Sequence, residues 1–169
     1  MEGTGLALMN RTPEPSRAQA APRQAQARPL FAGLGPLGAL PTAPRLARAF
    51  TGLVLAGWGL ARLTEDCGLI ISELTSNVVR AATGPDGQPR YDVHGRLPVL
   101  WLRLSSDRAW LWLEVCDNLT PELGVPAPRQ AAATDETGRG LELVSALSQD
   151  WGWDVFPGND VKRVWAALA

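Results

Sequence analysis

The spacing of apolar residues changes along this chain, and the two spacings predict helices first and strands later. From Thr42 onward, apolar side chains recur every three or four positions, and this helix is expected to end at the glycines beside Trp58. A second helix with the same period is predicted from Thr64 to about residue 82. Thr42 and Thr64 are both expected to be N-caps, because a threonine oxygen can accept a hydrogen bond from the free N–H groups of a first turn.

The second half of the chain alternates between apolar and polar residues, which predicts strands. Residues 99–104 and 109–116 are joined by a short polar turn and are expected to form an antiparallel hairpin. Residues 151–156 and 161–168 predict a second hairpin, and a helix is expected before it at residues 140–149. This order of elements predicts an α/β fold: a two-layer α/β sandwich whose mixed, mostly antiparallel sheet is covered by helices on one face.

Two segments lack a hydrophobic period. Residues 1–40 are expected to form a disordered tail rich in Ala, Pro and Arg, although its glycine-rich apolar end, residues 30–40, allows a short strand followed by a loop. The folded domain is therefore predicted to span residues 41–169. Residues 119–136 hold three prolines and an Ala-rich run, and they predict a mobile surface segment.

Composition narrows the class of protein. The chain has 169 residues and a formal net charge of −1, which suits one ordinary domain and predicts no nucleic-acid binding. No apolar run reaches the roughly 18 residues of a membrane span, and the start of the chain does not resemble a secretion signal. Cys67 and Cys116 have no zinc or redox spacing, so buried reduced thiols in a cytoplasmic protein are expected. The seven tryptophans are expected to pack the sheet rather than to stack on a ligand.

Glu73 and Asn77 stand four residues apart on the second predicted helix, so their side chains share one face. A carboxylate and an amide beside an apolar helix face are costly if buried without partners, and Mg²⁺ would satisfy both. Asn77 is then a candidate magnesium ligand, and Glu73 a candidate base for a hydroxyl that attacks a terminal phosphate. The plainer alternative is a solvated helix face with Glu73 near Arg80.

Asp117 ends the predicted strand at residues 109–116. A carboxylate in that position can accept a hydrogen bond from the exocyclic amine of adenine. It would favour adenine over guanine, which carries a carbonyl acceptor at the matching position. The alternative is an Asp-Asn turn that only caps the strand.

Gly138 and Gly140 flank Arg139 at the start of the predicted helix that includes Leu141. Glycines let backbone amides approach an anion closely, and a helix N-terminus adds a favourable dipole. Arg139 could meet a phosphate or an acidic neighbour. An ordinary helix start, with no ligand, is the alternative.

Taken in order, these motifs resemble those of a known family. Glu73-Leu74-Thr75-Ser76-Asn77 resembles the N box, Asp117 the first glycine-box acid, and Gly138-Arg139-Gly140-Leu141 the second glycine box of the GHKL (Bergerat-fold) ATP-binding family. The similarity is strongest to its small single-domain branch, the anti-sigma-factor serine/threonine kinases. Lys162-Arg163-Val164-Trp165 resembles the closing strand of actinobacterial members, and the likeness covers roughly residues 41–169.

The resemblance implies a Bergerat-type sandwich that binds ATP and Mg²⁺ beneath a lid at residues 119–136. It implies Glu73 as the catalytic residue, Asn77 as the metal ligand, and a nucleotide site formed by Asn77, Asp117, Gly138, Arg139, Gly140 and Leu141. Its implied partners are an anti-sigma-factor antagonist, which receives the γ-phosphate on Ser or Thr, and a sigma factor. Relatives often dimerise through the face near the first helices, so a homodimer is also among the expectations.

The chain departs from the family's pattern at three places. Asn118-Leu119 follow Asp117 where the family usually has Asp-x-Gly, Ala81 stands where many relatives carry histidine, and Gly124 is the sole glycine of the expected lid. These departures leave open a second hypothesis, an ATP-responsive partner-switch module with little or no phosphotransfer. A histidine kinase is disfavoured because His94, the only histidine, falls in a predicted loop.

Overall fold

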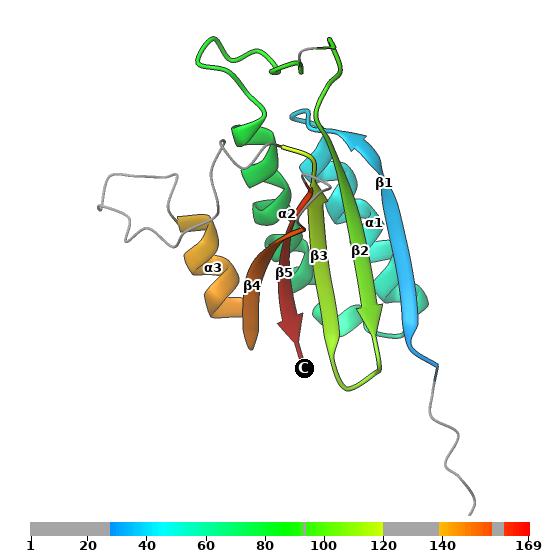
Figure 1. Cartoon of the computed structure of the whole chain (residues 1–169). Helices are drawn as coiled ribbons and strands as arrows, with labels where there is room; N and C mark the ends of the chain where they lie inside the picture. Colours follow the sequence, from blue (N-terminus) through cyan, green and yellow to red (C-terminus); the bar gives the residue numbers. More distant parts are fainter. Residues whose placement is uncertain (1–27, 93, 120–138, 157–160) are drawn as a thin grey trace, which may run out of the picture.

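The computed structural model describes residues 28–92, 94–119, 139–156 and 161–169, which form an α/β fold of two layers. One layer is a five-stranded antiparallel sheet, and the other contains three α-helices. Figure 1 looks onto the sheet, with α1 and α2 behind it and α3 beside the β4 edge. The α/β class expected from the element order is therefore confirmed.

The sheet has the strand order β1-β2-β3-β5-β4, and each neighbouring pair is antiparallel. The strands are β1 Leu30–Gly38, β2 Val99–Ser106, β3 Leu111–Asp117, β4 Asp150–Phe156 and β5 Val161–Leu168. Both predicted hairpins are present, but the described strands include no parallel pair, so the expected mixed sheet is not found among them. The second strand of the second hairpin, β5, lies beside β3 because its residues Val164, Ala166 and Leu168 are the more deeply buried.

The first strand, β1, lies within residues 1–40, which were predicted to form a disordered tail, and it corrects that prediction. β1 pairs along its length with β2, from Leu30 opposite Ser106 to Gly38 opposite Val99. It is longer than the short strand expected, so the folded part begins at about Leu30 rather than after residue 40. The glycine-rich sequence hid it, because Gly33 and Gly35 interrupt the alternation of side chains by which strands are recognised.

The helices are α1 Ala43–Gly57, α2 Thr64–Ala81 and α3 Arg139–Leu147, with a 3-10 turn, η1 Ala61–Leu63, leading into α2. Their positions match the predictions to within about two residues, but the predicted capping is only partly confirmed. Thr42 is at the N-cap of α1, as predicted, although its side chain makes no capping hydrogen bond, whereas Thr64 is already the first residue of α2, with Leu63 at the N-cap. Because η1 runs directly into α2, Thr64 itself has helical backbone angles, whereas an N-cap residue has non-helical ones.

The hydrophobic core lies between the helices and one face of the sheet. The strands contribute alternate residues to it, as the period of two requires. Its largest fully buried side chains are Leu55, Ile70, Ile71, Leu74, Leu100, Leu102, Leu104, Leu111, Leu113, Val115 and Val144. Leucines therefore occupy the helix side of β2 and β3.

Tryptophans lie on both faces of the sheet. Trp58 and Trp151 are partly buried against the core. Trp101, Trp112 and Trp165 instead alternate with the core residues of β2, β3 and β5, which places them on the face of the sheet that points away from the helices.

Both thiols are buried and unpaired, as predicted. Burial, with a smaller contribution from Asp66, raises the pKa of Cys67 to about 12, and burial likewise raises the pKa of Cys116. Among the described helices, none combines the length and the apolar character needed to cross a lipid bilayer.

Candidate functional site

Helix α2 presents the predicted polar pair on its partly exposed side. Ile70, Ile71 and Leu74 are buried, whereas Glu73 and Asn77 are half-buried. This follows from the helical period, because residues four apart lie one turn above each other on the same face. The orientation predicted for Glu73 and Asn77 is therefore confirmed.

The side-chain oxygen of Asn77 accepts a hydrogen bond from the guanidinium of Arg80, one turn further along α2. The alternative in which Arg80 accompanies Glu73 is not what the structure shows. Arg80 is exposed, so water can replace it at small free-energy cost when the amide oxygen binds another group. Asn77 thus presents a hard oxygen atom whose present partner is exchangeable.

Glu73 lies directly against the first turn of α3. A Cβ atom on Gly140 would overlap Oε2 of Glu73 and would lie 3.3 Å from its Cδ. Because residue 140 is glycine and has no side chain, there is room for the carboxylate of Glu73. The structure brings these two predicted site residues together although they are far apart in the sequence.

Asp117 closes β3 on the side of the sheet that faces the helices. Its side chain is 0% exposed. Oδ1 accepts a hydrogen bond of 3.1 Å from the backbone N–H of Leu119, while Oδ2 lies 3.4 Å from Nζ of Lys162 and has no hydrogen-bond partner among the described residues. Oδ1 is thus bonded to the backbone, whereas Oδ2 has, in the described part of the chain, only the ion pair with Lys162 and can accept a further hydrogen bond.

The predicted Asp-Asn turn is also real. Besides the bond from Leu119 to Asp117, Oδ1 of Asn118 accepts a hydrogen bond of 2.8 Å from the N–H of Val99, which ties the end of β3 to the start of β2. The turn and the adenine hypothesis are compatible, because the turn uses only one oxygen of Asp117.

Lys162 is the site residue that the sequence reasoning missed. It was noted only as part of the closing strand, yet β5 places it opposite Asp117, where it forms an ion pair with that buried carboxylate. Local sequence carries no signal for this pair. It becomes visible once β5 is known to lie beside β3.

Burial raises the pKa of Asp117, while Lys162 and the Leu119 N–H lower it by less. A raised carboxyl pKa means that Asp117 binds its proton more tightly in the folded state than in the unfolded state. The contribution of Asp117 to the free energy of unfolding therefore falls as the pH rises through the folded-state pKa, and it recovers as the pH is lowered. We expect the melting temperature of the wild type, minus that of Asp117→Asn, to increase as pH is lowered from 7 toward 4. Thermal denaturation of both proteins across that range measures it, and a difference that falls with decreasing pH would contradict the prediction.

The remaining predicted residues are placed as follows. Leu141 is partly buried against the core, and Arg139 is the first residue of α3. Gly138 and residues 120–136 of the expected lid lie outside the described residues, and only Leu119 of that segment is described, as a buried side chain. No hydrogen bond or ion pair among the described residues joins Asp117 to Glu73 or Asn77.

The described part of the chain contains no group of three His, Cys, Asp or Glu side chains arranged to hold a metal ion. Comparison with known proteins adds no family: no protein-family model matches this chain, and no curated protein matches it either. The positions of Glu73, Asn77 and Asp117 are therefore the observations from which a function can be inferred.

Proposed function

We propose that this chain is an ATP-binding regulatory protein of the GHKL (Bergerat-fold) type. In this proposal it transfers the γ-phosphate of ATP to a serine or threonine of an anti-sigma-factor antagonist in the cytoplasm, and so controls the availability of a sigma factor. Its nucleotide lies on the helix side of the sheet, between α2, the end of β3 and the start of α3.

The observation that carries the proposal is the state of Asp117. Oδ2 of Asp117 is wholly buried and has no hydrogen-bond partner among the described residues, although Nζ of Lys162 lies 3.4 Å away. Such an oxygen is expensive to bury, and such groups in proteins usually have a role or a missing partner. The exocyclic amine of adenine is a donor of the right kind. Lys162 keeps a positive charge close enough to favour the ionised form of Asp117, which is the better acceptor.

The phosphates and Mg²⁺ would lie toward α2 and α3. The Asn77 oxygen is a hard ligand of the kind magnesium prefers, and it would take part in a coordination shell completed by phosphate oxygens and water. Gly140 stands in the first turn of α3, where backbone N–H groups and the helix dipole favour an anion. Magnesium would neutralise developing charge on the phosphates when bound.

Glu73 is suited to accept the proton of the attacking hydroxyl. It lies one turn before Asn77 on the same face of α2, so a base and a metal ligand are presented side by side. Its contact with the first turn of α3 restricts the carboxylate to the region where the terminal phosphate is proposed to lie. A protein substrate then supplies the hydroxyl.

A second candidate function is an ATP-responsive module that captures a regulatory protein without phosphotransfer. Two departures from the family's pattern favour it, namely Ala81 and Asn118-Leu119. The two candidates share the nucleotide site and differ only in the fate of the γ-phosphate.

The adenine contact is tested by Asp117→Asn. Oδ1 of the asparagine can still accept from Leu119, but the amide nitrogen replaces Oδ2 and presents a donor to the donor amine of adenine. We expect affinity for Mg-ATP to fall about ten- to a hundredfold, as for loss of a hydrogen bond to a charged group, and preference for ATP over GTP to disappear. Isothermal titration calorimetry of the full chain with each nucleotide measures both.

The matched control is Asp154→Asn, which removes a carboxylate from β4 on the opposite face of the sheet and should leave nucleotide affinity unchanged. If the wild type gives no heat and no thermal shift with millimolar Mg-ATP or Mg-ADP, the proposed function is wrong. Incubation with γ-labelled ATP and a candidate antagonist then separates the two candidates, because only the kinase leaves label on serine or threonine.

A further inference from the structure

The face of the sheet that points away from the helices, here called the open face, combines aromatic and charged side chains. It is made of the residues that alternate with the core positions, and Trp101, Arg103, Trp112, Glu114, Arg163 and Trp165 are the ones that matter here. Figure 1 looks onto this face, and none of the described helices covers it.

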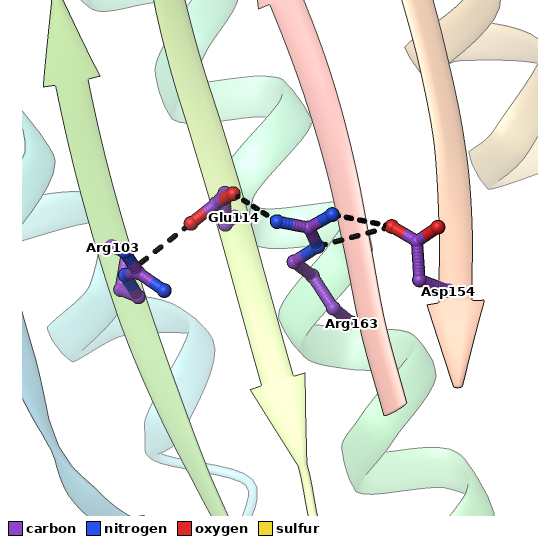
Figure 2. A network of polar contacts seen from close by, with 4 residues as sticks. All are labelled: Arg103, Glu114, Asp154 and Arg163. Atoms are coloured by element: carbon purple, nitrogen blue, oxygen red, sulfur yellow. Dashed lines mark hydrogen bonds and ion pairs between the residues drawn. The ribbon is translucent and has the colours of Figure 1, made fainter. Parts of the chain in front are cut away.

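Four charged side chains form a row across four strands of the open face, as Figure 2 shows. Arg103 on β2 lies 3.4 Å from Glu114 on β3, and Glu114 lies 2.9 Å from Arg163 on β5. Arg163 in turn reaches Asp154 on β4 at 2.6 Å. The signs therefore alternate along the row, plus, minus, plus, minus, and the row as a whole is neutral.

Aromatic rings accompany both cations of this row. The guanidinium of Arg103 lies 5.5 Å from the ring centre of Phe31, and that of Arg163 lies 5.4 Å from the ring centre of Phe156. Phe31 is 61% exposed and Phe156 is 40% exposed. Arginine and aromatic side chains are enriched at protein–protein interfaces, whereas the solvated face of an antiparallel sheet is usually polar.

The open face also has two hollows that can receive side chains of a partner. A hollow of about 450 Å³ lies beside Gly33, Gly35, Trp101 and Cys116, and its lining is mostly apolar. A second, of about 340 Å³, lies between Trp112, Glu114 and Trp165. No residue of the proposed nucleotide site lines either hollow.

We propose that the open face docks onto the same face of a second copy of this chain, around a two-fold axis that lies in the interface and crosses the charge row between Glu114 and Arg163. Such a rotation reverses the row. Arg103 then faces Asp154 of the second copy, and Glu114 faces Arg163 of the second copy. An alternating neutral row of four charges is complementary to its own reversal, and closed two-fold contacts require this kind of self-complementarity.

The size of the face suits this occupant. A sheet of five strands, each about seven residues long, presents roughly 570 Å² of flat area at ordinary strand spacings. Side chains standing on the sheet add to that figure, which brings it near the ~800 Å² per partner of a standard interface. A strongly charged partner is disfavoured because the row has no net charge. This contact differs from a dimer through the first helices and does not depend on nucleotide binding.

Charge reversal in complementary pairs tests the proposal. The variant Arg103→Glu/Arg163→Glu makes the row wholly negative, and Glu114→Lys/Asp154→Lys makes it wholly positive. Each alone should be monomeric, with a dimer dissociation constant raised at least about a hundredfold, because like charges would face each other. An equimolar mixture should form a heterodimer, and sedimentation velocity of the full chain measures all three samples together with the wild type.

A second variant guards against misfolding of the charge-reversed proteins. Phe31→Ser/Phe156→Ser removes two exposed rings without changing any charge, and it should weaken the wild-type dimer while leaving the melting temperature nearly unchanged. A wild-type protein that stays monomeric at about 100 µM, well above the dissociation constants of standard-size interfaces, overturns the proposal. So does a dimer of unchanged dissociation constant in the serine-substituted protein, or a dimer that persists in either charge-reversed protein, since it must then use another face.

Discussion

Replacement of Asn77 by alanine is expected to abolish magnesium-dependent nucleotide binding. In the proposed site the Asn77 oxygen is the ligand that the protein contributes to Mg²⁺, and alanine offers none. Calorimetric titration of ATP with and without Mg²⁺ gives the measurement. In the wild type magnesium should strengthen binding, whereas in Asn77→Ala the two titrations should coincide near the limit of detection.

Asn118→Ala provides the control for this variant. It removes an amide that bonds to the backbone N–H of Val99, so it should lower stability by about 1 kcal/mol while keeping the magnesium effect. A magnesium effect of normal size in Asn77→Ala would place the metal elsewhere. Loss of the effect in both variants would indicate a general disturbance of the fold rather than a lost ligand.

Replacement of Glu73 by alanine is expected to leave ATP affinity within a few-fold of the wild type and to lower phosphotransfer about 10²- to 10⁴-fold, the usual contribution of a general base. The separation arises because Glu73 is proposed to act on the attacking hydroxyl and not on the nucleotide. Because the Glu73 side chain packs against Gly140, its replacement by alanine leaves a gap there and introduces no steric clash. Label transferred from γ-labelled ATP to the antagonist, compared with calorimetric affinity, measures the two effects.

Glu65→Ala is the matched control, because Glu65 is an exposed acid in the first turn of the same helix. It should change neither quantity. If Glu73→Ala and Asn77→Ala lose binding and transfer to the same extent, the division of roles between them is contradicted. If the wild type binds ATP but transfers no label, the partner-switch function is the one that remains.

Much of the local structure could be predicted from the sequence. The apolar periods located three helices and two hairpins because those patterns repeat within one element and depend on near neighbours. The spacing of Glu73 and Asn77 also determined their shared face on α2. Predictions failed where local rules were overridden: Thr64 is not a cap because a 3-10 turn runs into it, and β1 was underestimated because its glycines leave no alternation to read.

The tertiary structure decided which of these elements meet. The pairing of β5 with β3 places Lys162 beside Asp117, and the packing of α3 on α2 places Gly140 against Glu73. Both contacts join residues tens of positions apart, and nothing in either local pattern encodes the partner.

The tertiary structure also decided which face of the sheet is covered by the helices. Alternation in the sequence shows that tryptophans and leucines of one strand lie on opposite faces, but not which face the helices cover. The helices cover the leucine face, so Trp101, Trp112 and Trp165 lie on the other, beside a charge row that exists only because four strands stand side by side. Elements follow from near neighbours in the chain, whereas sites and surfaces follow from the packing that minimises exposed apolar area over the whole fold.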